Sequence, residues 1–67
     1  MTPQAILALV QLALQLEPVV LPMVTSLVSH AQDAMAGFVV TPAQIQTTLS
    51  EYGTDMAALQ AAIAAKS

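Results

Sequence analysis

Ser26, His30 and Asp33 are the residues whose types and spacing come closest to catalytic chemistry. On a helix, residues at i, i+4 and i+7 lie near one another, so these side chains could supply a nucleophile, a general base and an orienting carboxylate. A working triad also needs a pocket and oxyanion donors, and its members usually come from different elements. We therefore interpret the three as a polar patch near a helix end, where a protonated histidine interacts well with the helix dipole. We expect the protein not to be an enzyme.

Glu17 is the second residue that could carry chemistry, because an ideal helix would place its carboxylate on the apolar face. One interpretation is a buried proton or ion site inside a membrane bundle, where ionisable groups tend to be functional. The alternative is that Pro18 distorts the helix and lets Glu17 reach water or a donor on a neighbour. We favour the alternative and keep Glu17 as the one candidate for an anomalous buried charge.

Other kinds of site have little support in the sequence. The chain has no cysteine and one histidine, which cannot by itself build a structural zinc site. Glu51, Thr54 and Asp55 lack the ligand spacing of a calcium loop, and there is no glycine-rich phosphate loop. We therefore expect no metal and no cofactor. One basic residue against four acidic ones, a net charge of −3, also makes nucleic acid an unlikely partner.

The composition points to a small protein that needs neighbours. The chain has 67 residues, of which 57% are hydrophobic and 7% charged, whereas about 25% is usual for the charged fraction of a soluble domain. A chain this short buries only about 60% of its unfolded surface. Without disulfides or a metal, such chains usually rely on oligomerisation. We predict one domain, residues 1–67, that associates with copies of itself or with a larger protein assembly.

The first helix is predicted over residues 3–36. Thr2 and Pro3 suit a helix start, and Gly37 suits a helix end. Pro18 and Pro22 interrupt the helix, and a full break would be expected to scramble the phase of its polar residues. The polar stripe instead stays in phase through both prolines; its members are Gln4, Ala8, Gln11, Gln15, Pro18, Pro22, Ser26, Ser29 and Asp33. We therefore predict one long helix with a kink.

The second helix is predicted over residues 42–65, after a turn at 37–41. Thr41 and Gln44 have the spacing of a capping box, and Pro42 suits the first helical position. Gly53 lies inside the helix, just before Asp55, which would suit a new helix start. The apolar residues keep their spacing across Gly53, so we favour a continuous or slightly bent helix over two short ones. The predicted fold is thus all-α: a long helix and a shorter one in an antiparallel hairpin that oligomerises.

Apolar residues on both helices are predicted to form the interface with neighbouring molecules. Those on the second helix are spaced four and three residues apart, as in a heptad seam. The predicted interface consists of Ile6, Leu9, Val10, Leu12, Leu16, Val20, Met23, Val24, Leu27, Ile45, Leu49, Tyr52, Met56, Leu59 and Ile63.

The turn and the second half of the chain, GFVVTPAQIQTTLSEYGTDMAALQAAIAA, resemble a class of short helical-hairpin proteins encoded among bacteriophage genes. In those proteins a hydrophobic first helix is likewise followed by a Thr-Pro start and an alanine-rich helix. The resemblance implies a virion or accessory component that packs against larger proteins.

Three functions remain open from the sequence. The first is a non-catalytic structural protein that oligomerises or lines a larger complex, in a virion or a cytoplasmic assembly. The second is a small membrane protein, such as a holin-like or pore-forming hairpin. The apolar run over residues 5–28 is long enough to cross a bilayer, but Lys and Arg are missing from its flanks. The third is a helical module that presents its apolar face to one partner.

Overall fold

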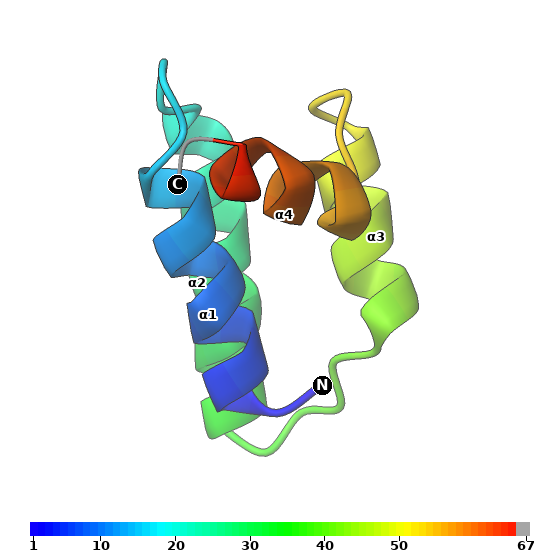
Figure 1. The fold of residues 1–67 in the computed structure, drawn as a ribbon. Helices are drawn as coiled ribbons and strands as arrows, with labels where there is room; N and C mark the ends of the chain where they lie inside the picture. Colours follow the sequence, from blue (N-terminus) through cyan, green and yellow to red (C-terminus); the bar gives the residue numbers. More distant parts are fainter. Residues whose placement is uncertain (66–67) are drawn as a thin grey trace.

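The computed structural model describes residues 1–65, which form four α-helices joined by short loops (Figure 1). The helices are α1 (Pro3–Leu14), α2 (Leu21–Met35), α3 (Pro42–Ser50) and α4 (Met56–Ala64). The prediction of an all-helical fold is confirmed. The predicted helix lengths are wrong, because each of the two expected helices is divided into two.

The first division separates α1 from α2. α1 begins as predicted, with the Thr2 hydroxyl accepting a hydrogen bond from the Ala5 N–H. It ends at Leu14, and a loop containing a cis Glu17–Pro18 peptide bond follows. Pro22 then lies in the first turn of α2, where its missing N–H is not needed. The single kinked helix over 3–36 is therefore a wrong prediction: Pro18 lies in a loop, and Pro22 lies in the first turn of a new helix.

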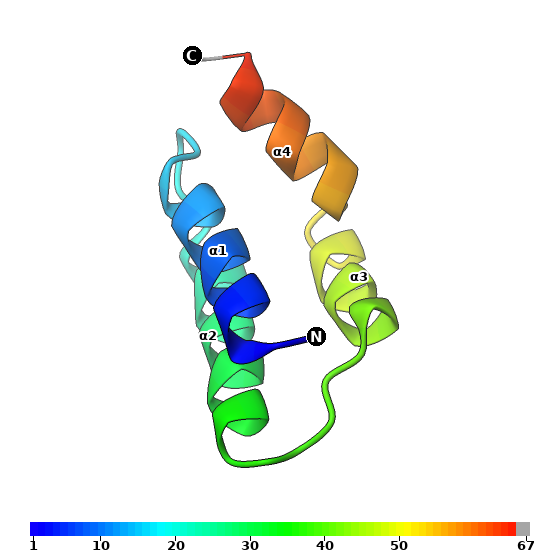
Figure 2. The ribbon, with the colours of Figure 1, turned by 60° about the horizontal axis from the view of Figure 1, so that its bottom comes forward.

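The loop between α1 and α2 lets these two helices lie side by side and antiparallel (Figures 1 and 2). Their mutual contact is the most extensive one between elements in the described chain. A single straight helix would leave both apolar faces without an intrachain partner, whereas the fold-back buries each against the other. Burial of these faces is the physical reason for the break.

The polar stripe across residues 4–33 does not show that these residues form one continuous helix. Gln4 and Gln11 are on the exposed side of α1, and Ser29 and Asp33 are on the exposed side of α2. Each helix thus has its own solvent-facing side. The length of the connecting loop happens to keep the two sides in phase along the sequence, and the stripe therefore runs through the prolines without a continuous helix.

The second division is at Gly53, which has a left-handed backbone with φ of 75°. The N–H of Gly53 donates to the Ser50 carbonyl and that of Thr54 to the Leu49 carbonyl, which is the pair of bonds of a Schellman motif. The Asp55 carboxylate then caps α4 by accepting from the Ala58 N–H at 2.7 Å. The continuous helix predicted over 42–65 is therefore wrong, and the weaker alternative, a break at Gly53, is what the fold contains.

One hydrophobic core joins the four helices. α2 contacts α1 and α3, and α4, which runs from the end of α3 towards α1 in Figure 1, contacts α1. The core consists of Ile6, Leu9, Val10, Ala13, Met23, Leu27, Ala31, Val40, Ile45, Leu49 and Leu59. Among residues 1–65, no helix has both the length and the hydrophobicity that a membrane span requires.

Most of the predicted interface residues lie inside this chain rather than on a free surface. Ile6, Leu9, Val10, Met23, Leu27, Ile45, Leu49 and Leu59 are buried, and Leu12, Leu16, Val20, Val24 and Met56 pack against them. Ile63 is half-buried, and only Tyr52 is classed as exposed. The reason is again the extra breaks, because a chain that turns back more often covers its own apolar faces.

Candidate functional site

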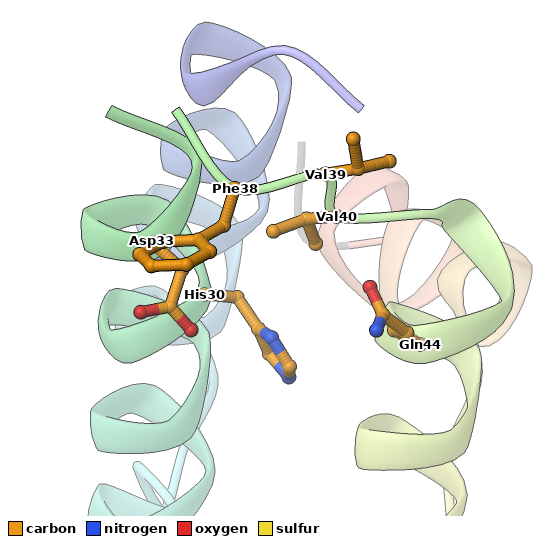
Figure 3. Close-up of a pocket in the computed structure, with 6 residues that line it drawn as sticks. All are labelled: His30, Asp33, Phe38, Val39, Val40 and Gln44. Carbon is orange, nitrogen blue, oxygen red and sulfur yellow. The ribbon is translucent and has the colours of Figure 1, made fainter. Parts of the chain in front are cut away.

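A pocket of about 330 Å³ lies between the C-terminal part of α2 and the start of α3. We call it the α2–α3 pocket; it is lined by His30, Asp33, Phe38, Val39, Val40 and Gln44. Figure 3 shows His30 and Asp33 on one side and Gln44 on the other, with the loop residues between the two helices. The pocket therefore combines a carboxylate, an imidazole, an amide and an aromatic ring.

The loop of the pocket is fixed at its first end by Gly37. Gly37 has a φ of 97°, and its N–H donates to the Ala34 carbonyl. The Phe38 N–H donates to the Asp33 carbonyl at 3.0 Å, which completes a second Schellman motif. The predicted helix end at Gly37 is confirmed, and it places Phe38 one turn beyond Asp33.

The second end of the loop is fixed by the capping box of α3. The Thr41 hydroxyl accepts from the Gln44 N–H, and the Gln44 Oε1 accepts from the Thr41 N–H at 2.9 Å. The predicted capping box is thus confirmed. Between the two fixed ends, Val40 is buried in the core while Val39 is 83% exposed. The amino group of Met1 donates to the Val40 carbonyl beside the pocket.

His30 is held in one orientation by a bond to α3. Its Nε2 lies 2.8 Å from the Thr48 Oγ1, and the Thr48 hydroxyl also donates to the Gln44 carbonyl at 3.1 Å. A hydroxyl has one proton, and Thr48 uses it on Gln44, so Thr48 must accept from His30. In the neutral imidazole, the proton is therefore on Nε2, and Nδ1 is an acceptor.

Asp33 supplies a carboxylate that no Lys or Arg side chain of residues 1–65 can neutralise. Residues 1–65 contain no Lys and no Arg, and the amino group of Met1 is bonded to Val40 instead. Asp33 is on the exposed side of α2 and lines the pocket. Its oxygens are available to a donor from outside the chain.

The triad-like spacing of Ser26, His30 and Asp33 does not produce a catalytic arrangement in the described chain. The Ser26 hydroxyl donates to the Pro22 carbonyl within its own helix, at 3.0 Å. His30 is bonded to Thr48, and Asp33 shares the pocket with it. The fold thus brings two of the three residues to one site and leaves Ser26 outside the pocket lining.

Glu17 is exposed in the loop between α1 and α2. The buried-charge candidate is therefore wrong. The favoured alternative was that the chain is distorted near Pro18 and that Glu17 reaches water. The structure agrees with it, since α1 ends before Glu17 and the residue is exposed. In residues 1–65, no three His, Cys, Asp or Glu side chains form a potential metal site, and every buried side-chain polar atom has a hydrogen-bond partner.

Phe38, Val39 and Gln44 are pocket residues that the sequence did not indicate as a site. The signal in the sequence is an apolar stretch, Phe38 to Val40, between a helix end and a capping box. The stretch predicts a turn, and it does not show that Val40 enters the core while Phe38 and Val39 stay exposed. Comparison of the chain with family models, curated proteins and solved structures gave no match.

The link between His30 and Thr48 can be tested with Thr48→Val. Valine keeps the shape of threonine but leaves the His30 Nε2–H without its acceptor in a half-buried place. We expect the free energy of unfolding to fall by about 1 kcal/mol. Thr47→Val is the matched control, because Thr47 is exposed and bonds only to the Ala43 carbonyl of its own helix. It should change stability by less than about 0.5 kcal/mol; equal effects in urea denaturation would contradict the link.

Proposed function

We propose that the protein is a non-catalytic structural protein whose copies pack against one another within a larger assembly. The observation that supports this most strongly is the position of its exposed apolar side chains at both ends of α2. We define the α1–α2 end as Leu14, Val19 and Leu21, and the α2–α3 end as Met35, Phe38 and Val39; all six side chains are exposed.

The two ends lie at opposite termini of α2 (Figure 1). α2 has 15 residues, and a rise of about 1.5 Å per residue separates its ends by roughly 20 Å. Leu21 is 66% exposed at one end and Met35 is 61% exposed at the other. Exposed apolar side chains that gather in one place often mark sites of protein–protein contact. Two separated apolar ends fit a protein that contacts two neighbours.

The low charge of the chain supports the same proposal. Charged residues make up 7% of the sequence, so little electrostatic repulsion opposes association. Contacts between unlike ends build rings or filaments, whereas contacts between like ends build closed dimers. The resemblance to phage helical hairpins makes a virion or accessory complex the assembly that we propose.

The proposal is tested by sedimentation of the full chain over a wide concentration range. We expect the average mass to rise with concentration. Leu21→Gln and Met35→Gln each replace one of the three apolar side chains of an end by a polar one without adding charge, and each should weaken association at least fivefold. Ala8→Gln places the same side chain on an exposed position of α1, between the ends, and should leave association unchanged.

Mixing the two end variants distinguishes the kinds of contact. If unlike ends meet, each variant is monomeric alone and an equal mixture forms a dimer through the two intact ends. If like ends meet, each variant alone stops at a dimer. A chain that stays monomeric at millimolar concentration contradicts the proposal. Flotation of the chain with phosphatidylcholine vesicles would favour the membrane function instead.

A further inference from the structure

We propose that the α2–α3 pocket binds an arginine side chain of a partner protein. The inference rests on the proposed function as a component of a larger assembly, since Phe38 and Val39 belong to both the pocket and the α2–α3 end. It adds the chemistry of the partner, which an apolar surface alone does not specify.

The polar groups of the pocket favour a ligand that donates hydrogen bonds. The Asp33 carboxylate only accepts, and the His30 Nε2–H is already used on the Thr48 hydroxyl, which leaves Nδ1 as an acceptor when the ring is neutral. An anionic ligand would be repelled by Asp33. The described chain has no Lys or Arg to offset this, and the Met1 amino group beside the pocket is used on the Val40 carbonyl. A guanidinium has five N–H donors and pairs with a carboxylate through two parallel bonds. It therefore fits the acceptors that the pocket offers.

The apolar groups of the pocket favour the rest of an arginine side chain. Phe38 is 68% exposed, so its ring is accessible to a cation, and arginine is the side chain that most often makes such contacts. Val39 and Val40 line the same pocket and offer apolar surface to the methylene stem. A volume of about 330 Å³ is at the small end of ligand pockets. It suits one side chain better than a cofactor.

The partner is a different protein rather than the described part of a second copy. Residues 1–65 contain no Lys and no Arg, so that part of another copy has no ammonium or guanidinium side chain to place beside Asp33. The chain has a net charge of −3, which attracts a basic partner. Charge complementarity therefore favours a basic side chain of another protein, and the exposed Phe38 and Val39 favour apolar residues beside it.

The test is a titration of the ¹⁵N-labelled full chain, kept dilute enough to be monomeric, with the peptide acetyl-Gly-Leu-Arg-Gly-amide. We expect saturable shifts of the amides of Asp33, Phe38 and Val39, with a dissociation constant on the order of 1 mM. The same peptide with citrulline in place of arginine has the same shape and no charge, and it should bind at least fivefold more weakly.

Two chain variants complete the test. Asp33→Asn should weaken arginine-peptide binding at least fivefold. Glu51→Gln removes the same charge from an exposed position at the far end of α3 and should change binding less than twofold. Equal binding of the arginine and citrulline peptides, or no saturable shift, overturns the inference.

The outcome is separate from that of the self-association test. Arginine-peptide binding by a chain that never self-associates would support the pocket and contradict the assembly of copies. If instead the same amides shift with protein concentration and Lys66→Gln abolishes those shifts, a second copy fills the pocket, and the inference of a different partner is overturned.

Discussion

Leu27→Ala lowers the free energy of unfolding by about 2–5 kcal/mol, the usual cost of emptying a core leucine position. Leu27 is fully buried at the centre of α2, the helix that contacts both α1 and α3. A chain of 67 residues has a total stability of roughly 3–10 kcal/mol at typical values per residue. We therefore expect a large loss of helical circular dichroism at 25 °C and a markedly lower urea midpoint.

Leu21→Ala provides the matched control on the same helix. It makes the same substitution at a position that is 66% exposed, so it leaves no cavity. Its effect on the free energy of unfolding should be below about 0.5 kcal/mol. Similar losses for the two variants would mean that Leu27 is not a core residue of α2. A larger loss for Leu21→Ala would mean that α2 buries the side that carries Leu21.

The helix starts could be predicted from sequence because they depend on residues a few positions apart. Thr2 with Pro3 begins α1, and Thr41 with Gln44 closes a capping box at α3. Gly37 marks the end of α2 for an equally local reason, since a left-handed residue is needed there. All three features satisfy backbone groups that a helix end leaves unpaired, and no distant contact is required.

The helix breaks could not be predicted in the same way. Continuity was inferred from a polar stripe and an apolar seam that kept their spacing across Pro18, Pro22 and Gly53. A periodic pattern shows which side of each segment is apolar, but not whether two segments belong to one helix. The choice depends on which apolar faces meet in three dimensions, and that contact favours the fold-back of α1 onto α2.

The pocket was predictable only in part for a related reason. The spacing of His30 and Asp33 placed both on one stretch of helix, and the fold does bring both to the pocket. Phe38 and Gln44 also line the pocket, because the loop after α2 brings the chain back beside this helix. The spacing of residues within one helix cannot predict such a contact. Thr48, which holds the His30 ring, lies 18 residues further along the chain.

Gly53→Ala lowers the free energy of unfolding by about 1–2 kcal/mol, because an L-residue at the left-handed φ of 75° is strained. A Cβ built at Gly53 meets no atom within 4 Å, so the cost comes from the backbone and not from a clash. A continuous helix would give the opposite sign, since alanine is about 1 kcal/mol better than glycine in a helix interior. Urea denaturation of the two proteins decides between the signs.

Two further substitutions at position 53 sharpen this result. Asparagine tolerates the left-handed region better than alanine, so Gly53→Asn should cost less than Gly53→Ala. D-Alanine, introduced by chemical synthesis, favours positive φ and limits the unfolded chain, so it should stabilise the protein by about 0.4–1 kcal/mol. In a continuous helix the order would reverse, with L-alanine best and D-alanine worst. The order of the three variants thus tests the break between α3 and α4.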